Sequence, residues 1–147
     1  MSRVQLALNV TDLDAAIDYY SKLFSSSPAK VRPGYANFAI DEPALKLVLI
    51  ENSTGGSLNH LGVEVEDTAA VDRAMQRVSN EGVEITKDER EVACCYATQD
   101  KFWTEDPDGL GWEVYTVLAD AEVMASTTSG NVASDACCGG TAAAACC

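Results

Sequence analysis

An internal repeat constrains the fold of this 147-residue chain more than any other feature of its sequence. Residues 5–12 (QLALNVTD) align with residues 60–67 (HLGVEVED), 55 positions further along. The identical pairs are Leu6 and Leu61, Val10 and Val65, Asp12 and Asp67, and Ala15 and Ala70. In each copy the alternation of apolar residues predicts a strand, which ends at a polar residue suited to cap a helix. The repeat therefore predicts two related modules.

The pattern after each strand predicts the rest of a module. Apolar residues at helical spacing indicate helices over about 13–24 and 69–80, with Thr11 or Asp12 and Asp67 or Thr68 as N-caps. Strand patterns follow at 35–40 and 45–51, and then at about 83–86, 93–98, 101–104 and 112–118. We expect an α+β fold, with modules of about 1–54 and 55–118 in one domain of residues 1–118.

Composition changes after Leu118. Residues 119–147 are mostly Ala, Ser, Thr and Gly, which cannot bury enough apolar surface to offset the entropy of ordering, so a flexible tail is expected. The tail carries two cysteine pairs, Cys137–Cys138 and Cys146–Cys147. Their use is open, between capture of arsenic or another soft metal on a flexible tether and dispensable low-complexity sequence.

The charge and cysteine content exclude several classes of protein. A net charge of −13 argues against nucleic-acid binding, and no apolar run is long enough to span a bilayer. The start of the chain lacks the pattern of a secretory signal, so we expect a cytoplasmic protein with reduced cysteines. The six cysteines fall in three adjacent pairs, which suit chelation of a soft ion better than a disulfide between neighbours.

Three polar residues form a candidate metal site. Gln5 and the single histidine, His60, occupy equivalent positions in the two copies, and Glu113 lies in an apolar strand where a carboxylate needs a partner. A lone histidine is more often structural than a ligand, but an imidazole, a carboxylate and an amide oxygen together leave coordination positions open. Such a set is similar to the facial triad that holds non-haem Fe(II).

The chain resembles the vicinal oxygen chelate superfamily of glyoxalases, bleomycin-resistance proteins and extradiol dioxygenases over about residues 2–118. Within it, the sequence is similar to the organoarsenical carbon–arsenic lyases and the cadmium-induced proteins. The segments that carry the resemblance are VQLAL (4–8), PGYANFA (33–39), LKLVL (45–49), NHLGVEV (59–65), ACCYA (93–97) and WEVY (112–115). Of these, ACCYA is the most discriminating.

The resemblance implies two βαβββ modules that form a cupped mixed sheet around a divalent metal, here held by Gln5, His60 and Glu113. Leu47 and Leu49 stand where some relatives carry a fourth ligand, which favours the dioxygen-using branch over the isomerases. The resemblance also implies that Cys94 and Cys95 bind a trivalent organoarsenical. The expected reaction is Fe(II)- and O2-dependent cleavage of the C–As bond of methylarsenite or a reduced aromatic arsenical, which releases arsenite.

Several alternatives stay open at this stage. Cys94 and Cys95 also suit a pair of small buried hydrophobes, and Tyr96 and Lys101 either orient substrate or serve only as strand residues. The chain could bind cadmium or arsenic without turnover, or act as a glyoxalase-like metalloenzyme. The preferred arsenical is not fixed by the sequence. The oligomeric state is also open, because relatives assemble the site within one chain or between two.

Overall fold

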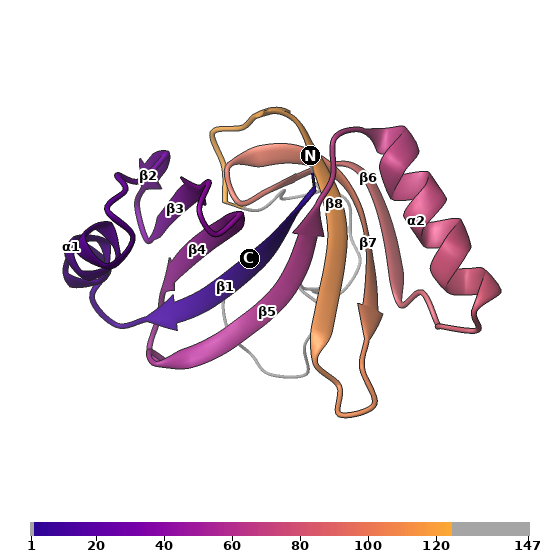
Figure 1. The fold of residues 1–147 in the computed structure, drawn as a ribbon, viewed down its shortest axis with the longest axis horizontal. Coiled ribbons are helices and arrows are strands. Elements are labelled where there is room, and N and C mark those ends of the chain that lie inside the picture. The colour runs from indigo at the N-terminus through magenta and orange to yellow at the C-terminus, as the bar shows by residue number, and fades with distance from the viewer. Residues whose placement is uncertain (1, 125–147) are drawn as a thin grey trace, which may run out of the picture. The chain divides into compact units, whose positions relative to one another are not determined.

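A computed structural model describes residues 2–124 of the chain. The chain divides between Glu64 and Val65 into two compact units. The order strand, helix, three strands occurs twice (Figure 1). The first run is β1 (Arg3–Val10), α1 (Leu13–Phe24), β2 (Lys30–Arg32), β3 (Tyr35–Ile40) and β4 (Leu45–Glu51). The second is β5 (Ser57–Glu64), α2 (Thr68–Asn80), β6 (Lys87–Cys94), β7 (Ala97–Glu105) and β8 (Gly111–Asp120). The predicted α+β class and doubled element order are confirmed.

The first unit is a mixed sheet with strand order β2-β3-β4-β1-β5. β1 pairs in parallel with β4 and antiparallel with β5, so it lies between these two strands. β1 and β5 are the strands that carry the sequence repeat. β5 belongs to this first unit, although the sequence repeat starts a new copy there. The registers place Ala7 opposite His60 and Gln5 opposite Gly62, which makes Gln5 and His60 diagonal neighbours.

One face of this sheet packs against α1. The buried cluster there consists of Leu13, Ala36, Phe38, Ile40, Leu47 and Leu49, with Leu6, Leu8 and Val10 of β1 packed against it. Residues of α1 at helical spacing complete the contact, namely Ile17, Tyr20 and Phe24. Because side chains alternate along a strand, Gln5, Ala7 and Asn9 project from the opposite face, where they are also buried.

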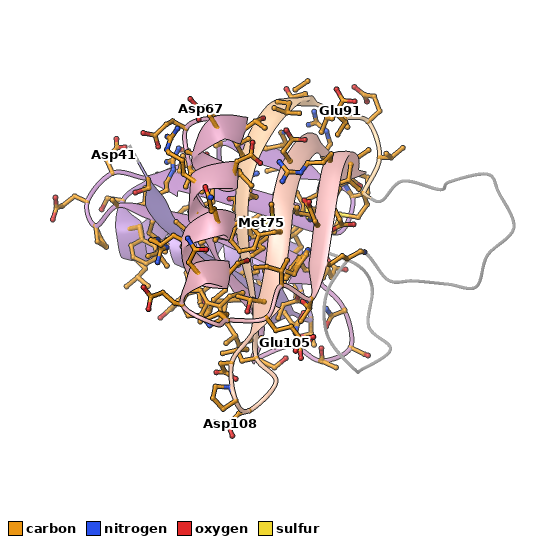
Figure 2. The ribbon with its side chains drawn as sticks, turned by 90° about the vertical axis from the view of Figure 1, so that its right-hand side faces the viewer. Asp41, Asp67, Met75, Glu91, Glu105 and Asp108 are labelled. Carbon is orange, nitrogen blue, oxygen red and sulfur yellow. The ribbon has the colours of Figure 1, made fainter. Side chains whose placement is uncertain are left out.

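The second unit contains α2 and the antiparallel strands β8-β7-β6. Figure 2 views this helix and its strands from the side, with Asp67 at the start of α2 and Asp108 on the β7–β8 turn. Thr68, the first residue of α2, donates its hydroxyl to Asp100 of β7 at 2.5 Å, and Val71 of α2 is fully buried. The face of β7 that carries Asp100 is therefore the face nearest the helix.

Each helix begins directly after the acidic residue that ends the repeated segment. Asp12 Oδ1 accepts from the backbone N–H of Ala15 at 2.9 Å, and Asp67 Oδ1 accepts from that of Ala70 at 2.7 Å. The acidic residues are the N-caps, and Thr68 is already helical. The N-cap carboxylates satisfy backbone donors that the first helical turn leaves unpaired.

Two strand predictions in the second copy are wrong, and others need new bounds. Residues 83–86 form no strand, and the predicted strand 93–98 is broken after Cys94 by a turn. β8 continues to Asp120, two residues beyond the expected end of the domain, because β7 pairs with it as far as Ala97–Asp120. Residues 125–147 of the predicted tail, with its four cysteines, lie outside the described residues. No helix among residues 2–124 is long and apolar enough to cross a membrane.

Candidate functional site

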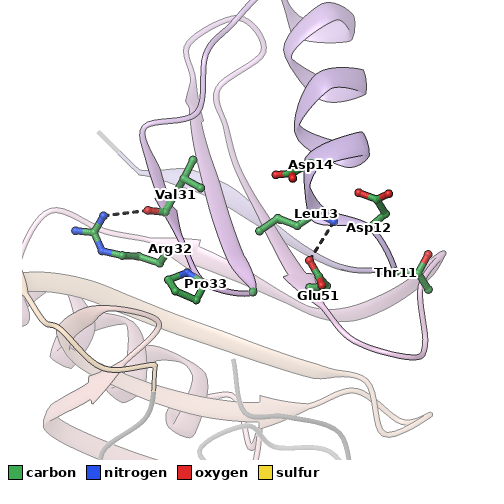
Figure 3. Close-up of a pocket in the computed structure, with 9 residues that line it drawn as sticks. Thr11, Asp12, Leu13, Asp14, Val31, Arg32, Pro33 and Glu51 are labelled. Carbon is green, nitrogen blue, oxygen red and sulfur yellow. Dashed lines mark hydrogen bonds between the residues drawn. The ribbon is translucent and has the colours of Figure 1, made fainter.

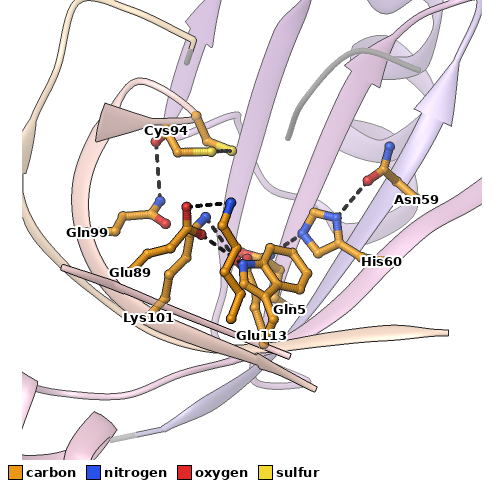
Figure 4. A network of polar contacts seen from close by, with 11 residues as sticks. Gln5, Asn59, His60, Glu89, Cys94, Gln99, Lys101 and Glu113 are labelled. Atoms are coloured by element: carbon orange, nitrogen blue, oxygen red, sulfur yellow. Dashed lines mark hydrogen bonds and ion pairs between the residues drawn. The ribbon is translucent and has the colours of Figure 1, made fainter. Parts of the chain in front are cut away.

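The first unit brings Gln5 and His60 together on the sheet face opposite α1. The amide nitrogen Nε2 of Gln5 lies 3.1 Å from Nε2 of His60 (Figure 4). Both side chains are almost fully buried, with 5% and 2% of their surfaces exposed. Burial at this level requires that the polar atoms have partners, because an unpaired buried donor or acceptor is costly.

A chain of hydrogen bonds fixes which nitrogen of His60 carries the proton. The backbone N–H of Thr54 donates to Asn52 Oδ1, so Asn52 turns its Nδ2 toward Asn9 Oδ1, 2.7 Å away. Asn9 Oδ1 also accepts from Asn59 Nδ2 at 2.9 Å, which leaves Asn59 Oδ1 facing His60 Nδ1 at 2.7 Å. Since a carbonyl oxygen only accepts, His60 Nδ1 carries the hydrogen.

His60 Nε2 is therefore the nitrogen with a lone pair. In the structure this lone pair accepts a hydrogen bond from Gln5 Nε2. Histidine ligands of metals commonly donate their other ring N–H to a carbonyl or carboxylate, and Asn59 Oδ1 accepts such a bond from His60. A half-turn of the Gln5 amide would present its oxygen instead of its nitrogen to the same place. This end of the first unit can thus offer one imidazole nitrogen and one amide oxygen.

The second unit holds Glu113 in an ion pair with Lys101. Lys101 Nζ lies 3.3 Å from Glu113 Oε2, and the two side chains have 0% and 5% exposed surface. The ammonium group also lies 5.2 Å from the centre of the Trp103 ring. Trp103 Nε1 in turn donates to Glu89 Oε2 at 3.1 Å. Lys101, predicted as a substrate-orienting residue, directly contacts the carboxylate predicted as a metal ligand.

The register of the second unit places several predicted site residues on one face. Cross-strand partners share a face, and β7 pairs Gln99 with Val92, Lys101 with Tyr115 and Trp103 with Glu113. Cys94 pairs with Ala97 and so shares that face. Asp100 contacts the start of α2 and points the other way. In each unit, then, the candidate residues lie on the sheet face turned away from its own helix.

A two-residue turn brings Cys94 and Cys95 together, and Cys94 is disulfide-bonded in this structure, contrary to the expectation of reduced cysteines. Cys94 and Ala97 form the last pair of the β6–β7 hairpin, so Cys95 and Tyr96 are its whole loop. Both loop residues have positive φ, 56° and 59°, as in the tight hairpin turns usually made by Asn-Gly. Neighbouring side chains on a straight strand point to opposite faces, but here the sulfur atoms of Cys94 and Cys95 are 3.4 Å apart.

The segment after β8 supports this turn. The backbone N–H groups of Cys95 and Tyr96 donate to the carbonyls of Met124 and Val123, at 2.6 and 3.1 Å. The carbonyl of Tyr96 accepts from the N–H of Ala121 at 3.0 Å. Left-handed backbone costs a non-glycine residue about 1 kcal/mol or more, so these bonds help to hold an unfavourable conformation.

Sequence reasoning missed some residues of these networks. Asn9, Asn52 and Asn59 set the tautomer of His60, and the signal that could have found them is the polar side chain of Asn9, two and four positions from Ala7 and Gln5 on the same strand face. The role of residues 121–124 had no signal, because their contribution is made by backbone groups.

A separate pocket of about 630 Å³ lies in the first unit, beside the start of α1 (Figure 3). Its lining residues are Thr11, Asp12, Leu13, Asp14, Val31, Arg32, Pro33, Gly34 and Glu51. Glu51 Oε2 accepts from the backbone N–H of Leu13 at 3.1 Å, so it already serves the helix start. The pocket contains none of the predicted site residues.

The candidate residues supply three donors for a metal only if the side-chain amide of Gln5 is included as a ligand. Among residues 2–124, His, Cys, Asp and Glu side chains form no group of three that could hold an ion. Counted by donor chemistry alone, His60, Glu113 and the Gln5 oxygen would supply three ligands. A neutral imidazole with its lone pair at Nε2, one carboxylate and one amide suit a divalent ion of the first transition row, with positions left for other ligands.

Comparisons with known proteins agree with this description. The chain matches the model of the Glyoxalase/Bleomycin resistance protein/Dioxygenase superfamily over residues 3–114. It is 57% identical to the Cadmium-induced protein CadI of Mycobacterium tuberculosis (strain CDC 1551 / Oshkosh), over 92% of this chain and 89% of the relative. It is 56% identical to a trivalent organoarsenical cleaving enzyme of Thermomonospora curvata, over 94% and 89%.

Among solved structures, the Mn(II)-bound glyoxalase of Novosphingobium aromaticivorans aligns with a TM-score of 0.58 at 21% identity, covering 87% of this chain and 44% of that one. This likeness concerns the fold. With the family match over most of the folded region, it confirms the resemblance seen in the sequence. The chain belongs to the Glyoxalase/Bleomycin resistance protein/Dioxygenase superfamily.

Proposed function

We propose that the protein cleaves the carbon–arsenic bond of trivalent organoarsenicals. The observation that carries the proposal is the pair of sulfur atoms of Cys94 and Cys95, 3.4 Å apart on the tight β6–β7 turn. Two adjacent thiolates match the preference of soft As(III) for sulfur. The similarity to a trivalent organoarsenical cleaving enzyme supports the same substrate class.

Binding of the arsenical is an exchange of ligands on arsenic. Methylarsenite carries one methyl group and two hydroxyls. In the reduced protein, the thiol of Cys94 displaces one hydroxyl and the thiol of Cys95 displaces the other, and each hydroxyl leaves with the thiol proton as water. The product is a dithioarsenite whose methyl group is held in place. Positioning a reactant in this way can contribute about 7–11 kcal/mol to lowering a barrier.

Gln5, His60 and Glu113 are proposed to hold Fe(II). When bound, the ion would supply the binding and activation of O2, which needs coordination positions that the protein leaves open. Asn59 keeps the proton on His60 Nδ1, so that Nε2 remains a ligand. Lys101 holds one oxygen of Glu113 and neutralises its charge. Leu47 and Leu49 are buried apolar residues of the first unit and offer no ligand.

The proposed reaction balances with O2 as the only co-substrate. Methylarsenite and O2 together contain the atoms of arsenite and formaldehyde, so one oxygen atom goes to arsenic and one to carbon. Carbon is oxidised, O2 is reduced, and arsenic stays trivalent. The test is anaerobic loading of the reduced protein with Fe(II), followed by methylarsenite and O2, with arsenic speciation and formaldehyde as the two readouts.

Variants decide whether the proposed residues carry the reaction. His60→Ala and Glu113→Ala are expected to abolish arsenite release and to lower the iron content after reconstitution. Cys94→Ser with Cys95→Ser should abolish arsenite release but keep the iron. If arsenite does not appear with the wild-type protein, or appears equally with His60→Ala, the proposal is wrong.

A second candidate function is binding of a soft metal without turnover. The similarity to a cadmium-induced protein, together with the thiol pair, favours it. In that case Cd(II) or As(III) binds tightly, binding survives Glu113→Ala, and it is lost when Cys94 and Cys95 are replaced. Both functions need the thiols, so release of arsenite by the wild type and its loss in Glu113→Ala distinguish cleavage from binding alone.

A further inference from the structure

Gln99 has a buried acceptor that the fold leaves unused. Its side chain lies on β7 with 5% of its surface exposed. Its Nε2 faces the backbone carbonyl of Cys94 at 3.4 Å (Figure 4). Among the side chains of residues 2–124, its Oε1 is the buried oxygen or nitrogen without a hydrogen-bond partner. If the side-chain amide were flipped, Oε1 would face the Cys94 carbonyl oxygen, and two acceptors would then lie against each other. The amide therefore keeps its orientation, and Oε1 is the atom without a partner.

The position of Gln99 relates this acceptor to the proposed substrate. Gln99 lies on the same face of the second unit as Cys94, Lys101 and Glu113, one strand position before Lys101 on that face. Its amide contacts the residue whose thiol is proposed to bind arsenic. A buried acceptor without a partner is unfavourable in the folded protein, so a donor supplied by a ligand at this place relieves that cost.

We propose that Gln99 Oε1 accepts a hydrogen bond from an O–H or N–H group of the arsenical held by Cys94 and Cys95. The inference rests on the proposed function for the identity of the substrate. Two parts of an arsenical can supply the donor. One is the hydroxyl that stays on arsenic after the first thiol has reacted, and the other is an amino or hydroxyl group on an aromatic substituent.

The test measures binding to the iron-free, reduced, full-length chain, in which Cys137, Cys138, Cys146 and Cys147 are changed to Ser. The probes are methylarsenite, 4-methylphenylarsenite and 4-aminophenylarsenite, the last two being of similar size with and without a donor. Gln99→Met removes the acceptor at similar length. Thr98→Val, on the opposite face of β7, is the matched control.

If the ring group is the donor, the wild type binds the amino compound about fivefold tighter than the methylphenyl compound, and Gln99→Met removes that preference. If the arsenic hydroxyl is the donor, Gln99→Met slows association of all three arsenicals by a similar factor. Thr98→Val behaves as the wild type in either case. The proposal is overturned when all three arsenicals bind Gln99→Met with unchanged affinity and rate. If the wild type binds none of them, the proposed function itself fails.

Discussion

The two units share one plan but stabilise their buried polar groups differently. In the first unit His60 and Gln5 are held by neutral amides, through Asn59 and Asn9. In the second unit the buried groups are charged, and Glu113 is paired with a fully buried lysine. Repetition of the element order has thus preserved the fold and the face that carries the candidate residues, but not their chemistry.

This difference indicates a division of work between the units. A network of neutral amides fixes the orientation of its side chains, because each donor and acceptor determines how the next group must point, and no charge is added. A buried carboxylate beside an ammonium group instead supplies charge in a place from which water is excluded. In the proposed function, the first unit aims the lone pairs of its ligands, and the second provides the negative charge and the thiols. Substitutions in the two units should therefore change the stability and the buried polar groups of the protein in different ways.

The largest effect is expected for Lys101→Met in the second unit. It leaves Glu113 buried without its ammonium partner, which should lower the free energy of unfolding by about 3–5 kcal/mol. Urea denaturation at neutral pH measures this change. The double variant Lys101→Met, Glu113→Gln removes both charges and should recover most of the loss.

An exposed ion pair in the first unit provides the matched control. Lys22 and Asp18 form an i,i+4 pair on α1 with side chains 74% and 66% exposed. Lys22→Met should change the free energy of unfolding by about 0.5 kcal/mol or less. Equal losses for the two lysine variants would contradict the view that the second unit depends on a buried charge pair.

A second charged residue of this unit, Asp100, should give stability a pH dependence. Burial tends to raise the pKa of Asp100, but the hydrogen bonds from Thr68 and from the backbone N–H of Glu91, with the nearby charge of Arg90, lower it overall. A lowered pKa in the folded state contributes stability at pH values above the ordinary aspartate pKa of about 3.9. That contribution is lost as the pH falls through the lowered pKa.

The difference between wild type and Asp100→Asn isolates this contribution. We expect the wild type to be the more stable of the two at neutral pH, and the two unfolding free energies to converge as the pH drops below about 4. Chemical denaturation at a series of pH values measures both curves. Asp18→Asn, which changes an exposed carboxylate, serves as control. A wild-type advantage that grows on acidification would show that the sign is wrong.

The sequence predicted much of the fold but only part of the site. The repeat and the helical spacing located both helices within one residue, because the caps Asp12 and Asp67 are local signals. The β6–β7 turn was missed because Cys-Tyr has no turn propensity, and its positive φ values are held by the distant backbone of residues 121–124. Gln5 and His60, which occupy equivalent repeat positions, lie in contact because their strands place them diagonally opposite.

A smaller effect is expected when the neutral network of the first unit is broken. Asn59→Leu removes the acceptor for His60 Nδ1–H, so the imidazole should populate both tautomers, and stability should fall by about 1 kcal/mol. The chain has one histidine, so a long-range ¹H–¹⁵N spectrum at mildly alkaline pH contains a single imidazole and needs no assignment.

A buried asparagine outside the network supplies the control for this spectrum. Asn37 on β3 donates to the hydroxyl of Tyr35, and Asn37→Leu should cost similar stability while the hydrogen stays on His60 Nδ1. The wild-type spectrum itself is decisive, since a hydrogen found on Nε2 would rule out the orientation deduced from Thr54 through Asn52.

The smallest difference is expected where the two units are most alike, at their helix caps. Asp12→Ala and Asp67→Ala each remove a carboxylate that accepts from the backbone N–H three residues on, which should cost about 1 kcal/mol. The start of α1 keeps a second acceptor, since Glu51 Oε2 still takes the N–H of Leu13. Asp12→Ala should therefore be the milder change, by a few tenths of a kcal/mol, and adding Glu51→Ala, which removes the second acceptor, should bring the first unit level with the second. Thermal unfolding of the three variants under identical conditions resolves the order, and a larger loss for Asp12→Ala would mean that Glu51 does not support the helix.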